Sequence, residues 1–252
     1  MRVFLTLLRR ELGGFFLSPT GYVIIAAVML ILGLTFDVLI TGLLGADPQP
    51  MPITEIFYGT SIFWLIVLLV TPVITMRLFA LEKYSGTFET LMTTPVNDLQ
   101  VVASKFIAAI IFYMVTWLPM LACLFVVRHF TNQHEALDAG TLGGMYLGTF
   151  LVGCLFLSLG CFASSLTRSQ MAAAMVSFVL GVSLFLLGYM AEQITATPTQ
   201  WASQVLSYFD LFDQMLDFAR GIVDTKAVVL CASLTFFFLF LTLRTVESRR
   251  WK

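Results

Sequence analysis

Residues 58–75 read YGTSIFWLIVLLVTPVIT, a run of eighteen residues without a charged side chain. A helix needs about 20 mostly apolar residues to cross the hydrocarbon core of a bilayer. This run therefore predicts a transmembrane helix. Five further stretches have a similar apolar character, and with the first they predict an all-α integral membrane protein with six spans in a single domain of residues 1–252. The five are residues 21–40, 101–127, 142–166, 171–191 and 227–246.

The composition of the whole chain agrees with a membrane protein. Of its 252 residues, 59% are hydrophobic and 12% are charged, whereas soluble domains have about 45–50% apolar and about 25% charged residues. A soluble fold of this length would lack the polar residues to cover its surface. The net charge of −1 gives no basic field that would attract a nucleic acid, so we expect no nucleic-acid partner.

The centres of the predicted spans carry almost no ionisable side chain. Asp37, Lys105 and Arg244 lie near span ends, where a long side chain can extend to the headgroups. Ion-coupled transporters usually place such groups at mid-membrane to bind the coupling ion. We therefore expect any energy for transport to come from outside this chain.

Lys and Arg residues predict the orientation of the spans, because cytoplasmic loops carry an excess of both. Eleven of the 14 basic residues would lie on one side and three on the other. Both termini are therefore predicted to be cytoplasmic. The three on the external side are Arg128, Arg220 and Lys226.

Residues 2–17 predict an amphipathic interfacial helix rather than a signal peptide. The charges of Arg9, Arg10 and Glu11 interrupt the apolar run after a few residues, and no small-residue cleavage site follows. Polar and apolar residues instead form two opposite stripes at helical spacing. Ser18-Pro19 is expected to end this helix, because the residue before proline disfavours the α region.

The segment 76–100, MRLFALEKYSGTFETLMTTPVNDLQ, is the longest one predicted between spans on the basic side. Residues 76–84 continue a helical pattern, with Arg77, Glu82 and Lys83 expected to face water. Gly86 breaks that helix, and Thr87 can cap a second short helix. Two short helices with a glycine between them could form a docking site for a partner or a structured loop without one.

This segment closely resembles the cytoplasmic loop of ABC-2-type permeases, whose members often read RxxAEEKRSGTxExLLTxPV there. Leu81, Tyr84 and Ser104 depart from the acidic residue, arginine and glycine that are usual in the family. The resemblance implies that the segment couples the chain to a separate ATPase. The coupling residues that it implies are Arg77, Glu82, Lys83, Gly86, Thr87, Glu89, Leu91 and Pro95.

Three further stretches are similar to the branch of this family that includes the gliding-motility permease. They are FFLSPTGYV at residues 15–23, YFDLFDQMLDFARGIVDT at 208–225 and ESRRW at 247–251. The resemblance implies a six-span subunit of an inner-membrane exporter that pairs with an identical copy or a paralogue and contacts membrane lipid. An external accessory protein is a further possible partner.

The cofactors ATP and Mg²⁺ are expected in the partner ATPase and not in this chain. The sequence contains no Gly-x-x-x-x-Gly-Lys-Ser/Thr run of a phosphate-binding loop. Cys123, Cys154, Cys161 and Cys231 lie in apolar runs and form no metal-ligand pattern. We therefore predict no metal site, no cofactor and no enzymatic activity of its own.

The segment 192–225 is predicted to contain an external interfacial helix. Asp210, Asp213 and Asp217 would lie on one face, with Phe209 and Phe212 on another. The carboxylates could bind calcium, but a solvated face is the simpler interpretation. Gly221, after Arg220, is expected to end the helix in the left-handed conformation.

Small residues at i and i+4 predict close helix packing in the fourth and fifth spans. Gly144 with Gly148, Gly160 with Ser164, and Ser177 with Gly181 have this spacing. An intramembrane enzyme is the weakest hypothesis, because hydroxyls such as Ser158 and Ser183 have no acid or histidine partner at depth. A mechanical role, in which ATPase cycles move an envelope machine without moving a solute, stays open beside export.

Overall fold

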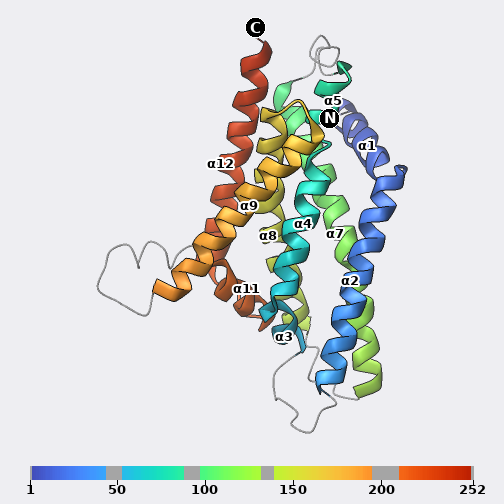
Figure 1. Cartoon of the computed structure of the whole chain (residues 1–252), viewed down its shortest axis with the longest axis vertical. Coiled ribbons are helices and arrows are strands. Elements are labelled where there is room, and N and C mark those ends of the chain that lie inside the picture. The colour runs from blue at the N-terminus through green and yellow to red at the C-terminus, as the bar shows by residue number, and fades with distance from the viewer. Residues whose placement is uncertain (1, 44–52, 88–96, 132–138, 195–209, 251–252) are drawn as a thin grey trace.

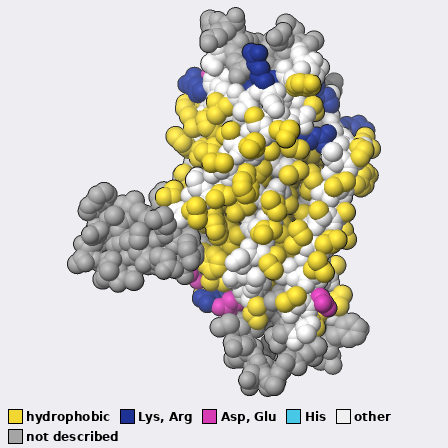
Figure 2. All heavy atoms as spheres, in the orientation of Figure 1, with side chains coloured by type: hydrophobic (Ala, Val, Ile, Leu, Met, Phe, Trp, Pro, Cys, Tyr) yellow, Lys and Arg dark blue, Asp and Glu magenta, His cyan; other side chains and the backbone are white. Residues whose placement is uncertain are grey.

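The computed structural model describes residues 2–43, 53–87, 97–131, 139–194 and 210–250. These residues form helices and turns, and no strand occurs among them. Six helices are long and apolar enough to cross a membrane, which confirms the predicted all-α, six-span fold class. Figure 2 shows a broad hydrophobic band across one face, with charged side chains toward the two ends.

The spanning helices form an upright bundle with shorter helices at both ends (Figure 1). Five of the spans are α2 (Pro19–Leu43), α7 (Asp98–Thr131), α8 (Ala139–Leu166), α9 (Gln170–Ile194) and α12 (Thr225–Arg250). The other runs from α4 (Ser61–Thr75) through a turn into α5 (Ala80–Tyr84) and ends at Tyr84. Helices α1 (Arg2–Phe16) and α5 lie at one end, where α12 finishes, whereas α3 (Ile53–Gly59) and α11 (Leu211–Ala219) lie toward the other.

Helix α8 is the central element of the bundle and packs against α4, α7, α9, α11 and α12. Its glycines allow these close approaches. A Cβ at Gly160 would lie 2.2 Å from Thr75 Oγ1 of α4, and one at Gly153 would lie 2.2 Å from the Tyr113 ring of α7. Such distances leave no room for a side chain, so the shape of α8 fixes where its neighbours pass.

The small-residue pair Gly144 and Gly148 in the fourth span meets Phe218 of α11. A Cβ at Gly148 would lie 2.8 Å from Phe218 Cβ, and one at Gly144 would lie 2.8 Å from the Phe218 carbonyl oxygen. These glycines were predicted to allow close helix packing, and the helix that they admit is the short helix α11. In α9, a Cβ at Gly181 would lie 3.2 Å from Leu68 of α4, and Ser177 is buried.

The connection between α1 and α2 is a tight elbow. Helix α1 ends at Phe16, and Pro19 occupies the first turn of α2, where its missing N–H is no loss. A Cβ at Gly21 would lie 2.1 Å from the Phe15 carbonyl oxygen, so this approach requires glycine. The Phe15 ring stacks on Phe112 of α7 with centroids 4.9 Å apart, which fixes α1 on the bundle.

Candidate functional site

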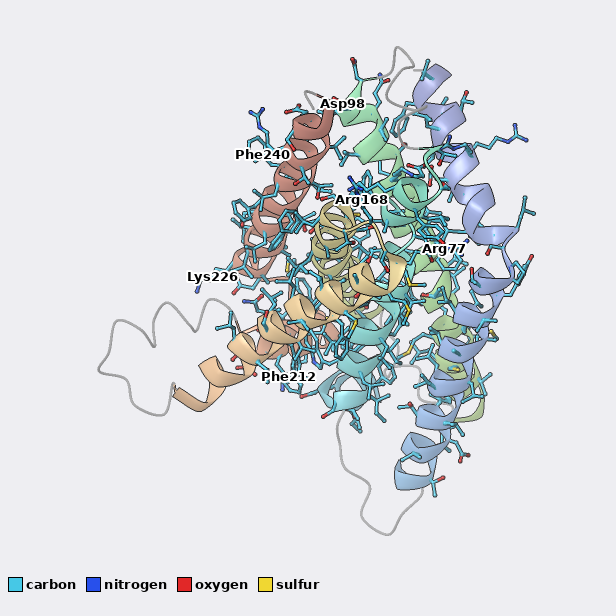
Figure 3. The ribbon with its side chains drawn as sticks, turned by 45° about the horizontal axis from the view of Figure 1, so that its top comes forward. Arg77, Asp98, Arg168, Phe212, Lys226 and Phe240 are labelled. Atoms are coloured by element: carbon cyan, nitrogen blue, oxygen red, sulfur yellow. The ribbon has the colours of Figure 1, made fainter. Side chains whose placement is uncertain are left out.

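The candidate site lies at the end of the bundle that holds α5, where Figure 3 also labels Arg77, Asp98 and Arg168. Helix α4 ends at Thr75, and α5 begins at Ala80 after a turn. The predicted continuous helix over residues 76–84 is therefore wrong. Residues 76–79 form a turn, and the N–H groups that the helical path would have bonded to residues of α4 bond instead to Ser164 of α8.

Helix α5 is capped by a side chain from α8. The backbone N–H groups of Phe79 and Ala80 both donate to Ser164 Oγ at 3.1 Å. The first N–H groups of a helix have no partner within it, so this buried hydroxyl substitutes for a local cap. Lys83 at the other end of α5 donates to the backbone carbonyl of Ser165. Both ends of α5 are therefore attached to the last turn of α8.

Four charged side chains from three helices meet beside α5. Lys105 Nζ of α7 lies 3.0 Å from Glu11 Oε1 of α1 and 2.8 Å from Glu82 Oε1 of α5. Arg10 Nη2 of α1 lies 3.0 Å and 2.8 Å from the same two oxygen atoms. Two cations and two carboxylates thus alternate around a ring, which we call the Lys105 cluster.

Lys105 is the most deeply buried member of the Lys105 cluster. Its side chain is 2% exposed, and its Nζ lies 5.6 Å from the centre of the Phe79 ring. We had expected this lysine to extend to the headgroups, and that prediction is wrong. The carboxylates of Glu11 and Glu82, which approach from elements distant in the sequence, give the ammonium group a nearer partner than water.

The charges of the Lys105 cluster depend on one another. Burial alone would disfavour the charged form of Arg10, but Glu11 and Glu82 outweigh it and raise the pKa of Arg10. Glu82 Oε2 is buried without a hydrogen-bond partner among the described residues. The two carboxylates of the cluster therefore depend on Arg10 and Lys105 for charge compensation. Loss of either cation would leave a buried negative charge without a partner.

Arg77 connects the loop to the elbow between α1 and α2. Its Nη1 donates to Ser18 Oγ at 3.1 Å and also to Thr20 Oγ1. The two most distinctive motifs of the sequence, at residues 15–23 and 76–96, are therefore in direct contact. Arg77, Glu82 and Lys83 make these contacts within the protein, which corrects the expectation that they serve mainly as water-facing groups.

The exposed residues of this region form a short, uncharged surface on α5 and the turn that comes after it. Tyr84 is 79% exposed, and Gly86 has φ of +74°, a conformation that favours glycine. Ser85 Oγ and Thr87 Oγ1 lie 2.9 Å apart in the turn. We call the exposed residues of this turn the α5 rim: Leu81, Tyr84, Ser85, Gly86 and Thr87.

Several predicted coupling residues fall outside this description. Glu89, Leu91 and Pro95, with the second helix predicted after Thr87, lie outside the described residues. Sequence reasoning missed Arg10 and Ser164 as partners of the loop, and Glu11 as a member of the Lys105 cluster. None of the three lies near it in sequence, and only the coincidence of a buried lysine with two distant acidic residues could have indicated the cluster.

The opposite end of the molecule carries α11, within the predicted external segment. Asp210 is buried and accepts a hydrogen bond from the Asp213 backbone N–H at 3.2 Å, so it caps α11. This corrects the prediction of a solvated face of three carboxylates. Gly221 has φ of +82°, which confirms the predicted helix end, and Phe209 lies outside the described residues.

Helix α11 is joined to α3 as well as to α8. Arg220 Nε donates to Glu55 Oε1 at 2.9 Å, and the hydrogen bonds and charge of Glu55 raise the pKa of Arg220. Thr54 Oγ1 donates to the Ala219 carbonyl at 3.2 Å. Among the described residues no group of His, Cys, Asp or Glu could hold a metal ion.

The fold defines a class of protein: a multi-pass helical membrane protein with a short helix, α5, fixed to one end of its bundle. Residues 18–244 match the family described as ABC-2 family transporter protein, and the chain belongs to that family. Members of this family are the membrane components of ABC transporters and are not themselves the ATPase. They work with an ABC ATPase and often form dimers. No curated protein matches the chain.

Proposed function

We propose that this chain is the permease subunit of an ABC exporter and that its ATPase docks on residues 76–100. The observation that supports this most directly is the contrast between the charged side chains of α5 and its exposed uncharged ones. Its charged side chains are used inside the protein, in the Lys105 cluster and at Ser165. The α5 rim, which includes the highly exposed Tyr84, is accessible at this end of the bundle. Aromatic groups of this kind are common at the centres of protein interfaces.

We further propose a bacterial cytoplasmic membrane in which the α5 end and both termini face the cytoplasm. Arg2 and Arg250 bound the first and last helices, α1 and α12, at that end. Most of the chain's basic residues also lie on this side, as the excess of Lys and Arg in cytoplasmic segments requires. An ATPase in the cytoplasm would then meet the α5 rim directly.

The working unit that we propose is a pair of permease chains with two ATPases, which bind ATP and Mg²⁺. The closure of two nucleotide-binding subunits can move the membrane helices only if each subunit holds a permease of its own. The second permease is an identical copy or a paralogue, and the pathway lies between the two. Native mass spectrometry of the purified complex should show two permease chains for every two ATPases, whereas a stable and active one-to-one complex would contradict the proposal.

The docking proposal is tested by Gly86→Val, with Gly143→Val as the matched control. Valine at position 86 must adopt a positive φ that β-branched residues strongly disfavour, so the α5 rim changes shape. A Cβ at Gly143 meets nothing within 4 Å. We expect Gly86→Val to insert normally but to lose co-purification with the ATPase or coupled ATP hydrolysis. Full coupling in this variant would refute docking at the rim, and Glu89→Lys provides an independent second test.

A mechanical role is the second candidate, favoured by the similarity of residues 15–23 and 247–251 to the gliding-motility branch. In that case ATPase cycles would move an external machine, through an accessory protein, without moving a solute. The Arg77 contact with Ser18 and Thr20 would serve either role. Adjacent genes for an ATPase and for envelope or motility components would favour the mechanical role, and adjacent genes for an ATPase alone would favour export.

A further inference from the structure

The guanidinium group of Arg77, which Figure 3 labels, has hydrogen-bond donors that the described part of the protein does not use. An arginine side chain carries five N–H donors and no acceptor. Nη1 uses two of them on the hydroxyls of Ser18 and Thr20. Nε and Nη2 make no hydrogen bond with a described residue, and neither nitrogen is buried. Three N–H donors of Arg77 are therefore accessible to a ligand.

Arg77 also has no acidic partner among the described residues. Glu11 borders the same small cleft as Arg77, but its carboxylate is paired with Arg10 and Lys105. No carboxylate of the described residues forms an ion pair with Arg77 itself, although the side chain is partly buried. An anion would supply the compensating charge that this arginine lacks.

The two hydroxyl groups beside Arg77 add a further donor. Ser18 Oγ and Thr20 Oγ1 lie 2.7 Å apart, so one hydroxyl donates to the other. The hydrogen of the second hydroxyl is left without an acceptor among the described residues. The site therefore presents a positive charge and several donors, which selects an anion with several oxygen atoms. A phosphate group fits this pattern, because two parallel N–H groups of an arginine can bind two of its oxygens.

The site lies where a span enters the bilayer. The apolar part of α2 runs from Pro19 to Val38, over 20 residues, and a helix of that length rises about 30 Å. The hydrocarbon core is also about 30 Å thick, so Thr20 lies at the boundary between hydrocarbon and headgroups. Tyr22 is exposed beside it, as is common for tyrosine at this boundary. Arg77 contacts Thr20 and therefore reaches the level of the lipid phosphates.

Exposed apolar side chains lie next to the site. Leu17, which directly precedes Ser18, is 84% exposed. Further exposed residues follow Thr20 along α2 at intervals of three or four, a spacing that puts them on one side of the helix: Val23, Ala27, Leu30 and Leu34. A protein that docks from water does not suit these surroundings. A phospholipid does, because it has a phosphate for the polar site and acyl chains for the apolar stripe.

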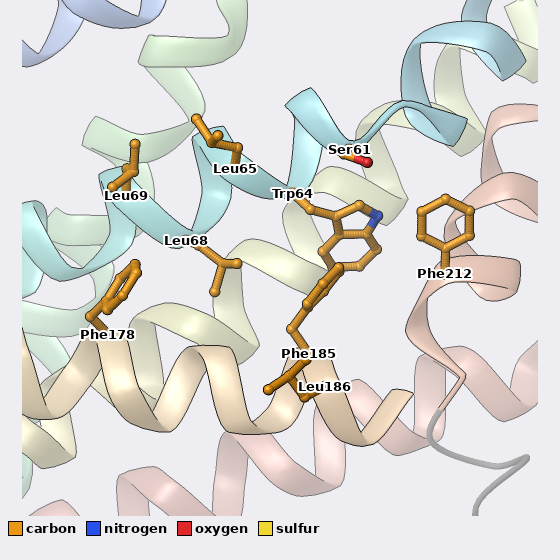
Figure 4. Close-up of a pocket in the computed structure, with 9 residues that line it drawn as sticks. All are labelled: Ser61, Trp64, Leu65, Leu68, Leu69, Phe178, Phe185, Leu186 and Phe212. Carbon is orange, nitrogen blue, oxygen red and sulfur yellow. The ribbon is translucent and has the colours of Figure 1, made fainter. Parts of the chain in front are cut away.

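The large cavity between α4, α9 and α11 lacks the features of the Arg77 site (Figure 4). None of the residues that line it is charged, and Ser61 is the one with a hydroxyl group. Its lining gives no reason to prefer one lipid headgroup over another. Ser61 is therefore a suitable control position for the removal of a hydroxyl group at the Arg77 site.

We propose that Arg77, Ser18 and Thr20 bind the phosphate group of an anionic membrane phospholipid, whose acyl chains lie along the exposed stripe of α2. The guanidinium Nε and Nη2 donate to two phosphate oxygens, and the free hydroxyl hydrogen is available to a third. A zwitterionic lipid has the same phosphate but brings a cation of its own, so the anionic headgroup is preferred. This inference goes beyond the proposed function and holds whether or not an ATPase docks at the α5 rim.

Native mass spectrometry of the full chain in detergent tests the proposal. Phosphatidylglycerol and phosphatidylcholine with the same acyl chains are added in equal amounts, and we expect the wild type to retain more phosphatidylglycerol. Arg77→Gln should lower this preference about five-fold, the contribution of one basic residue near an anionic surface. Arg168→Gln removes an exposed arginine between α8 and α9 and should leave it unchanged. An unchanged preference in Arg77→Gln, or an equal loss in Arg168→Gln, would overturn the proposal.

The hydroxyl variants decide the matter if Arg77→Gln does not fold. Thr20→Val keeps the size of the side chain and should lower the preference by less than Arg77→Gln, whereas Ser61→Ala should not change it. Equal preferences in these two variants would overturn the proposal.

Two further outcomes identify other ligands for Arg77. Excess glycerophosphoglycerol, the same headgroup without acyl chains, should not displace the lipid, and displacement would show a site for a free phosphate ester instead. An unchanged lipid preference in Arg77→Gln, together with lost co-purification of the ATPase, would assign Arg77 to the contact with the ATPase. Either result would overturn the proposal.

Discussion

The two ends of this molecule each carry a short helix attached to α8, but they hold it by different means. At one end α5 is attached by charges and hydrogen bonds, through the Lys105 cluster and Ser164. At the other end α11 is attached mainly by shape, because Phe218 lies against Gly144 and Gly148. Both helices end at a glycine with positive φ, Gly86 and Gly221, so the difference lies in their anchoring.

The two kinds of anchoring contact differ in how easily they can rearrange. Contacts fixed by shape are close-packed and resist small displacements. Ion pairs and hydrogen bonds can exchange partners when a neighbouring protein moves one of them. A buried ion cluster is seldom more stable than an apolar replacement, so stability alone does not account for the Lys105 cluster. Its distinctive property is that it joins α1, α5 and α7 at one point.

The largest expected effect is that of Lys105→Met on stability. The substitution leaves Glu11 and Glu82 buried beside Arg10 alone, and breaking a buried pair in this way typically costs about 3–5 kcal/mol. Thermal unfolding in detergent, followed by size-exclusion chromatography, should show a clearly lowered midpoint. Lys226→Met removes an exposed lysine and serves as the control. An unchanged midpoint for Lys105→Met would mean that the cluster carries no mutual stabilisation.

The second prediction separates stability from coupling at the α5 end. In the triple variant Glu11→Met, Glu82→Met and Lys105→Met no buried charge is left without a partner. Apolar replacement of a whole buried ion cluster is often neutral or stabilising, so the midpoint should return to near the wild-type value. Coupled ATP hydrolysis should nevertheless stay low, because α5 no longer moves α1 and α7 together. Normal coupling in the triple variant would make the cluster a purely structural feature.

The third prediction concerns the end that is held by shape. A Cβ in Gly148→Ala would lie 2.8 Å from Phe218 Cβ, which is attached to the α11 backbone and cannot rotate away. Overpacking of this kind typically costs about 1–3 kcal/mol. In Gly143→Ala the added methyl meets nothing within 4 Å, and its stability should be equal or higher. Equal effects of the two variants on the unfolding midpoint would contradict the claim that close packing against the glycines holds α11 in place.

The smallest effect is expected for Arg220→Gln, which breaks the ion pair with Glu55 at the α11 end. Arg220 is exposed, and exposed pairs contribute little because water and salt screen them. The unfolding midpoint should stay within experimental error at physiological salt. A loss comparable to that of Lys105→Met would show that the two ends do not differ in the way described above.

The six spans could be predicted from the sequence because each depends on a local property, a long run of apolar residues. The segment around α5 could be chosen as a candidate site for a similar reason, since its motif is continuous. The Lys105 cluster could not, because Lys105 and Glu11 are 94 positions apart and Arg10 and Glu82 are 72 apart. Pairings of that kind depend on how the helices pack and leave no periodic signal.

The segment that contains α11 shows a second limit of sequence reasoning. Carboxylates at positions 210, 213 and 217 have the spacing of one helix face, but Asp210 precedes the helix and caps it. The same residues fit a cap or a face equally well until the start of the helix is known, and helix boundaries are uncertain by one or two residues. The spacing of Gly144 and Gly148 likewise indicated a close approach without indicating which helix approaches.

The most direct test of the central claim, that the α5 rim meets the ATPase, is photocrosslinking from position 84. A photoreactive phenylalanine analogue replaces Tyr84, which is 79% exposed, in the complex purified with its ATPase. The same analogue replaces Phe240, an exposed residue of α12, as the control. The account predicts an ATPase crosslink from position 84 and none from position 240. A complex that hydrolyses ATP but gives no crosslink from position 84, or one of equal yield from position 240, would contradict it.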